Sequence, residues 1–177
     1  GAIRVRYRWA GAGGGAAVFA LSEDGGTLTD LGDRAGAEPE RLCRAEVRAE
    51  SPAGAWTARL ASVIYDEPAG LFWDAPGLLL VKYGFHAYGF AARSGELRWL
   101  HRSASPLLVV IGSSRLDHVV ACSEVETTAL GADGAVAWRV AHSDVVAAAE
   151  LVGGRLVLTS YTGQVTALDP LTGRTVA

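Results

Sequence analysis

Three glycines in the second half of the chain recur at a constant interval. They stand 39 residues apart, at Gly95, Gly134 and Gly173. Tryptophan follows the first two after four residues, as Trp99 and Trp138, and Ala177 takes that place after the third. A fixed period of about 40 residues is typical of repeat architectures, in which each unit packs against its neighbours.

Each 39-residue unit contains four short apolar runs separated by Gly, Ser, Asp or Pro. Leu79–Tyr83 (LLVKY) and Pro106–Ile111 (PLLVVI) are examples. Short apolar runs with frequent turns predict β-strands, and four strands per period predict a propeller blade. Because one blade cannot bury both of its apolar faces alone, we expect each Trp to cover the turn of the neighbouring blade.

The sequence therefore predicts an all-β fold, a small or partial β-propeller of about four four-stranded blades within a single domain. An irregular β-sandwich or barrel is the alternative. Residues 1–59 would form an irregular first blade, and residues 60–103, 104–143 and 144–177 the repeat blades. In the second blade, Leu60–Tyr65 is expected to be a strand and Asp66–Pro76 an insertion.

The last repeat carries a recognisable motif. Ala167–Ala177 reads ALDPLTGRTVA and resembles the blade motif of PQQ-like (quinoprotein-type) β-propeller repeats, Ala-x-Asp-x-x-Thr-Gly-x-x-x-Trp. Four positions match, Ala167, Asp169, Thr172 and Gly173, and Ala177 departs at the Trp. The resemblance covers about residues 60–177 and implies the fold. A quinone cofactor would require a full ring with axial ligands, and no residues here are assigned to it, so no cofactor is expected.

Charge and cysteine content exclude several classes of function. Sixteen Lys and Arg stand against nineteen Asp and Glu, a net charge of −3 that disfavours nucleic-acid binding. The sequence contains no apolar stretch of about 20 residues, the length that a helix needs to span a membrane. Cys43 and Cys122 lie far apart without a C-x-x-C motif, which favours two buried thiols over one long-range disulfide. Arginines interrupt the apolar N-terminus, so no secretion signal and a cytoplasmic location are expected.

No catalytic or metal-binding pattern stands out. The four histidines lack metal-ligand spacing; they are His86, His101, His118 and His142. The sequence has no G-x-S-x-G, and its GAGGG run is not followed by the Lys-Ser or Lys-Thr of a phosphate-binding loop. We therefore expect neither a metal site nor catalytic residues, while enzymatic activity stays open.

Several side chains near predicted turns are candidates for contacting a partner. Tyr83 recurs as Tyr161 two periods later, and the alternative is that both pack between blades. Phe72 and Trp73 lie in the expected insertion, where they could instead cap the core. The full set of candidates is Tyr83, Phe85, His86, Glu124, His142, Asp144, Tyr161, Phe72 and Trp73.

These patterns favour a non-catalytic scaffold that binds a protein partner, in the manner of an inhibitor or immunity-type protein. A homo-oligomer that completes the propeller is a further expectation. The alternative function is a small-ligand binder or enzyme that uses a pocket at the central channel.

Overall fold

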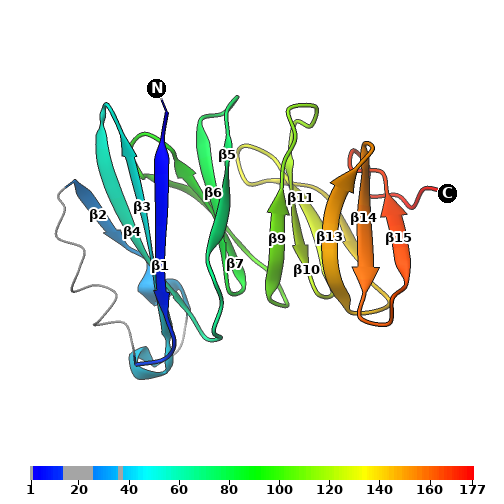
Figure 1. Ribbon diagram of the computed structural model, residues 1–177, viewed down its shortest axis with the longest axis horizontal. Helices are drawn as coiled ribbons and strands as arrows, with labels where there is room; N and C mark the ends of the chain where they lie inside the picture. The colour runs from blue at the N-terminus through cyan, green and yellow to red at the C-terminus, as the bar shows by residue number, and fades with distance from the viewer. Residues whose placement is uncertain (1, 14–25, 36–37) are drawn as a thin grey trace. The chain divides into compact units, whose positions relative to one another are not determined.

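The computed structural model describes residues 2–13, 26–35 and 38–177. This part of the chain forms fifteen β-strands, arranged in four sheets, and two short 3₁₀ helices (Figure 1). The chain divides into two compact units, Gly1–Gly84 with Phe90–Leu97 and Phe85–Gly89 with Arg98–Ala177. The sheets are described in chain order.

The first sheet has a mixed topology. Its strands lie in the order β1 (Arg4–Ala10), β3 (Cys43–Ser51), β4 (Gly54–Ser62) and β2 (Thr27–Asp30). Strands β3 and β4 form an antiparallel hairpin, whereas β2 runs parallel to β4. The segment between β2 and β3 forms the 3₁₀ helices η1 (Gly32–Ala35) and η2 (Pro39–Arg41). Residues 14–25 and 36–37 of the expected irregular first blade lie outside the described residues.

The second sheet corrects the predicted strand positions. Its order is β5 (Ala69–Trp73), β6 (Leu78–Tyr83), β7 (His86–Ala91) and β8 (Leu97–Arg102). The predicted strand at Leu60–Tyr65 is only partly correct. Residues 60–62 are strand, but they end β4 of the first sheet, where Ser62 pairs with Cys43 of β3, and residues 63–65 lie outside any strand. The predicted insertion at Asp66–Pro76 is wrong, because it contains β5. Prolines on both sides of β5 give it the appearance of a loop in the sequence.

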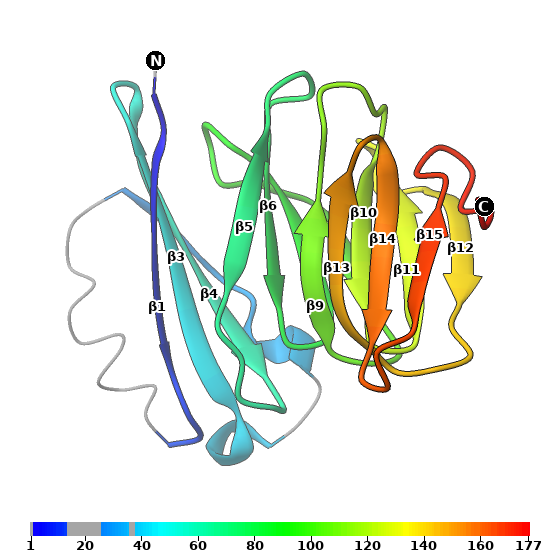
Figure 2. The same cartoon turned by 45° about the vertical axis from the view of Figure 1, so that its right-hand side comes forward.

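The third and fourth sheets are antiparallel and lie in the second unit (Figure 2). The third has the order β12 (Val136–Ala141), β11 (Glu126–Leu130), β10 (Val119–Ser123) and β9 (Leu107–Ile111). The fourth has the order β13 (Val146–Val152), β14 (Arg155–Ser160) and β15 (Val165–Leu168). A single bridge joins Leu168 to Thr175 beside β15. We call this three-stranded sheet the open sheet.

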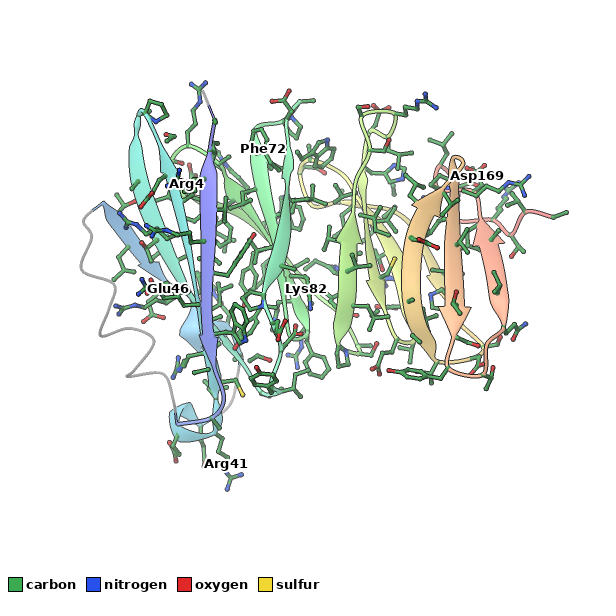
Figure 3. All side chains as sticks on the ribbon, in the orientation of Figure 1. Arg4, Arg41, Glu46, Phe72, Lys82 and Asp169 are labelled. Carbon is green, nitrogen blue, oxygen red and sulfur yellow. The ribbon has the colours of Figure 1, made fainter. Side chains whose placement is uncertain are left out.

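Inner strands are covered on both faces, as their continuous apolar runs predict. All six residues of β6 are buried, including Lys82 (Figure 3). Its ammonium donates to Oδ1 of Asp66 at 2.9 Å, and Oδ2 of the same carboxylate accepts the backbone N–H of Gly84. The buried charge therefore has the partner that its burial requires.

Tryptophan side chains pack on turn glycines at the positions expected from the repeat. The indole of Trp99 donates to the Ala132 carbonyl at 3.1 Å, and a β-carbon on Gly134 would stand 2.7 Å from that of Trp99. Trp138 likewise donates to the Pro170 carbonyl at 3.0 Å and packs on Gly173. Each contact, here called a joint, ties the fourth strand of one sheet to a turn near the next, and requires a glycine there.

A further joint lies in the first unit and does not follow the Gly-to-Trp spacing. Trp56 of β4 donates to the Ala92 carbonyl at 2.8 Å and packs on Gly95. Its ring also lies 5.2 Å from that of Phe90, measured between centroids. Trp56 and Gly95 are 39 residues apart, which is one period of the repeat, so the sequence itself contains this relation.

Both cysteines are buried and unpaired, as predicted. Burial raises the pKa of the Cys122 thiol to about 12, which makes it unreactive near neutral pH. Across the described ranges, no helix has the length and apolar character needed to cross a membrane.

Candidate protein-binding surface

The aromatic group predicted as a binding surface lies mostly in the interior. Tyr83, at the end of β6, has no exposed surface, and His86, at the start of β7, is 6% exposed. Phe85, between them, is half-buried. Tyr83 and His86 are therefore unavailable to a partner, which corrects the prediction for these two residues. The reason is that they terminate strands buried on both faces.

Phe72 and Trp73 lie on β5, at the edge of the second sheet. Phe72 is 48% exposed, and Trp73 is half-buried. Successive side chains on a strand point to opposite faces, so the two cannot contact one surface together. Phe72 keeps the exposure that a binding residue needs, and its role stays a prediction.

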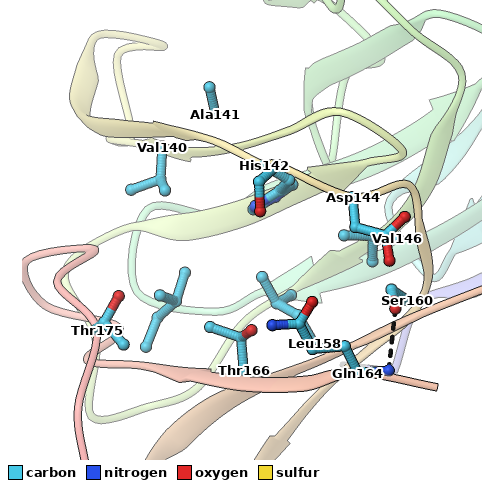
Figure 4. A pocket seen from close by; sticks show the side chains of 12 residues that line it. Val140, Ala141, His142, Asp144, Val146, Leu158, Ser160, Gln164, Thr166 and Thr175 are labelled. Atoms are coloured by element: carbon cyan, nitrogen blue, oxygen red, sulfur yellow. Dashed lines mark hydrogen bonds between the residues drawn. The ribbon is translucent and has the colours of Figure 1, made fainter. Parts of the chain in front are cut away.

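His142 and Asp144 line a small pocket in the second unit (Figure 4). The pocket has a volume of about 170 Å³ and lies between the segment after β12 and the strands β14 and β15. Val140, Leu158 and Leu168 supply its apolar lining. The sequence analysis named His142 and Asp144 as candidates, but not the residues of β14 and β15 that line the same pocket.

The polar groups of the pocket are held in place by hydrogen bonds. The His142 Nε2 atom lies 2.7 Å from the Thr127 hydroxyl oxygen, and burial lowers the pKa of this imidazole. Asp144 accepts the Thr162 hydroxyl and the N–H of Val145, and these bonds hold the pKa of its carboxyl low. These bonds therefore tie the segment after β12 to β11 and to the turn after β14.

The described residues were also compared with the requirements of a metal centre. Residues 2–13, 26–35 and 38–177 contain no cluster of three His, Cys, Asp or Glu that could hold a metal. Glu124 sits in the turn before β11, where its carbonyl accepts the Val146 N–H at 2.9 Å. Its carboxylate is half-exposed, and its predicted role in binding is not decided by this placement.

The outer face of the open sheet is the surface that sequence reasoning missed. Val120 and Ala129 pair in the third sheet and are at most 1% exposed, because the open sheet covers them. In the open sheet the corresponding pair is Val157 and Ala167, which are half-buried, and the adjacent Val165 is 63% exposed. Side chains that are buried in the third sheet thus have counterparts in the open sheet that are partly exposed.

Tyr161 lies beside this face and is the most exposed of the large apolar and aromatic side chains described. It is 69% exposed, and its N–H donates to the Val145 carbonyl at 3.0 Å. Tyr161 thus stands where its aromatic ring can contact a partner, unlike its repeat counterpart Tyr83. Leu156, Val157 and Leu158 follow one another in β14, a run typical of a strand covered on both faces, so the sequence carries no signal that this face is exposed.

Comparisons with known proteins agree on the fold. No family model and no curated protein matches the chain. Among solved structures, the computationally designed Ika8 protein matches with a TM-score of 0.58 and 12% identity, over 80% of this chain and 46% of that one. BamB from Moraxella catarrhalis matches with a TM-score of 0.54 and 19% identity, over 77% and 45%. The dihydro-heme d1 dehydrogenase NirN, in complex with DHE, matches at 0.59 and 16%, over 78% and 34%.

The chain spans less than half the length of each of these structures. At these identities the likeness concerns the fold alone. BamB and NirN are β-propeller proteins, and the present chain has four successive sheets, the second to fourth of which correspond to the repeat. The predicted fold class is confirmed: the chain has an all-β, propeller-type fold.

Proposed function

We propose that the chain is a non-catalytic protein-binding scaffold and that Phe72, on the edge strand β5, lies in the surface that binds its partner. The exposure of Phe72, at 48%, carries this proposal, because exposed aromatic side chains are enriched in interfaces. Burying apolar surface contributes about 25 cal/mol per Å², so a partner that covers this side chain gains free energy directly.

The finer expectations belong to this proposal. The match of Ala167–Ala177 to the PQQ-like motif supports membership of that repeat family. The free, buried state of Cys43 and Cys122 suits a reducing, cytoplasmic compartment. An inhibitor or immunity-type role is the form of protein binding that we favour, with an enzyme as the bound partner.

A small-ligand binder is the second candidate, supported by the polar rim that His142 and Gln164 give the pocket. Its volume of about 170 Å³ favours the scaffold instead. Sites for small molecules usually enclose about 300–1,000 Å³.

The test captures proteins from a lysate of the cells that naturally produce the chain. Wild type, Phe72→Glu and the matched control Val63→Glu serve as bait, since Val63 is equally exposed, at 48%, but lies outside β5. We expect Phe72→Glu to lower recovery of a specific partner at least tenfold, because it places a charge in an apolar interface, and Val63→Glu to leave recovery unchanged. Equal recovery with all three baits would refute the assignment of the surface.

A further inference from the structure

We propose that the surface around Phe72 continues as an aromatic stripe and that this stripe binds a proline-rich, basic segment of a protein partner in the polyproline conformation. The aromatic stripe consists of Phe72, Tyr7, Trp9 and Tyr65, all of which lie in the first unit. This inference rests on the proposed function and names the chemistry of the partner.

Strand β1 separates charged from aromatic side chains. Its sequence, RVRYRWA, alternates arginine with Val5, Tyr7 and Trp9, so the arginines lie on one face and the aromatic residues on the other. The aromatic face meets β5, because a β-carbon on Gly70 would stand 2.6 Å from the Tyr7 hydroxyl oxygen. Tyr7 and Trp9 are therefore neighbours on a surface to which β1 contributes no positive charge.

Strand β5 and the segment before it extend this surface beyond β1. Phe72 lies two residues after Gly70, so its side chain is on the face of β5 that meets Tyr7 (Figure 3). The Trp9 indole donates to the Tyr65 hydroxyl at 3.2 Å, which adds Tyr65 to the row. The four aromatic side chains thus follow one another between β1 and β5.

The aromatic stripe offers both apolar rings and hydroxyl groups to a partner. Tyr65 is 62% exposed, Phe72 48% and Trp9 38%, and Tyr7 is half-buried. Among the described residues, none is hydrogen-bonded to the Tyr7 hydroxyl, and burial raises its pKa above the ordinary value of 10, so it keeps its proton. The Tyr65 hydroxyl accepts the Trp9 N–H, which leaves its own O–H to donate.

These properties fit a proline-rich segment. Such segments dock on grooves lined by aromatic side chains, and their conformation costs little entropy on binding because it is already formed. A polyproline helix has no internal hydrogen bonds, so its carbonyls accept from donors such as the Tyr7 and Tyr65 hydroxyls. An added β-strand would instead bind through the backbone groups of a sheet edge and would not need these hydroxyls.

The charges around β5 indicate a basic partner. Glu67 and Asp74 stand just before and just after this strand, and both are exposed. Lys82, which pairs with Ala69 of β5, is buried, and its ammonium donates to Asp66. The rim of the aromatic stripe is therefore acidic, and a complementary segment carries Lys or Arg beside its prolines.

The experiment measures binding of fluorescent peptides to the intact chain by anisotropy. The probe begins with Arg and continues with repeated Pro-Pro-Ala units. One matched peptide begins with Glu, and another has Gly at every Pro. We expect the Glu peptide to bind at least threefold more weakly, because of the acidic rim, and the Gly peptide at least tenfold, because it lacks the preformed conformation. Equal binding of the Glu peptide would overturn the basic partner, and equal binding of the Gly peptide the proline-rich one.

Variants of the chain test the location. Phe72→Ala and Tyr65→Ala should each weaken binding of the Arg peptide at least fivefold, whereas Tyr161→Ala, at an exposed tyrosine of the second unit, should not. Tyr65→Phe keeps the ring and should lose at least twofold with the hydroxyl. These side chains are exposed, and circular dichroism checks that the variants fold. An equal loss with Tyr161→Ala, or no loss with the other variants, would overturn the assignment to the aromatic stripe.

Capture from the lysate separates this inference from the proposed function. If no peptide binds while partner capture stays sensitive to Phe72→Glu, the proline-rich occupant is wrong and the scaffold function stands. If capture is insensitive as well, both are wrong. Self-association of the chain in light scattering that Phe72→Glu abolishes would make a second copy the occupant and overturn the proposal.

Discussion

Two glycines of the second unit share a left-handed backbone and differ in their surroundings. Gly134 has φ +81° and lies under Trp99, whereas Gly154 has φ +77° and would have no atom within 4 Å of an added β-carbon. Any substitution at either position strains the backbone, but only at Gly134 would an added β-carbon also clash with a neighbouring side chain, that of Trp99. The pair therefore separates the conformational role of glycine from its packing role.

Gly134→Ala should lower the free energy of unfolding more than Gly154→Ala does. Both variants lose about 1–2 kcal/mol to the left-handed backbone, and Gly134→Ala loses a further ~1–3 kcal/mol by pushing against Trp99. Urea denaturation of wild type and both variants measures the difference. Equal destabilisation would mean that Trp99 moves aside freely and that the joint is not tightly packed.

At the level of the strands, the sequence predicted contacts correctly where the residues lie in complete 39-residue repeats. The contact between Gly134 and Trp99 could be predicted because both residues lie in such repeats. Trp56 was missed because the residue four positions before it is Pro52 rather than glycine. Strand β5 was missed because it has only five residues and lies between prolines. Short, flanked strands depend on pairing with a neighbour, here β6, which local sequence does not reveal.

The joints should differ in how much the hydrogen bond of the indole N–H contributes to the free energy of unfolding. The Ala92 carbonyl receives Trp56 at 2.8 Å, whereas the Pro170 carbonyl receives Trp138 and also lies 2.6 Å from His118 Nε2. Trp56→Phe should therefore cost about 1 kcal/mol more than Trp138→Phe, because Pro170 retains a donor when its indole is removed. Guanidinium denaturation followed by far-ultraviolet circular dichroism measures both, and a larger loss in Trp138→Phe would contradict this account.

For the molecule as a whole, the exposed face could not be read from the repeat. Periodicity states that each sheet resembles its neighbour, and so predicts similar burial for Val120 and Val157. The structure shows that the two differ, since burial depends on what covers a face and not on its sequence. For the same reason the repeat alone could not show that Tyr161 is exposed while Tyr83 is buried.

The stability of the molecule should fall as the pH decreases from 7.5 to 5.5. Burial lowers the pKa of His86, His101 and His142 below the ordinary value of 6.5. The unfolded chain therefore takes up protons first as the pH falls through 6.5, and the loss continues down to the folded-state values. Each histidine contributes at most about 1.4 kcal/mol per pH unit.

Urea denaturation at several pH values measures this slope. His142→Gln should reduce it, because the amide does not titrate. Glu50 and Asp144 have carboxyl pKa values held low by hydrogen bonds, so their contribution is lost only at more acidic pH. Stability that stays constant or rises between pH 7.5 and 5.5 would contradict the prediction.

The joints also bear on how such a chain can change over evolutionary time. Each indole recognises a main-chain carbonyl, and the three residues that supply it are Ala92, Ala132 and Pro170. Every residue type carries that carbonyl, so the accepting position is free to drift as long as the nearby glycine remains. The residues that supply the carbonyls can thus change while the geometry of the joint persists.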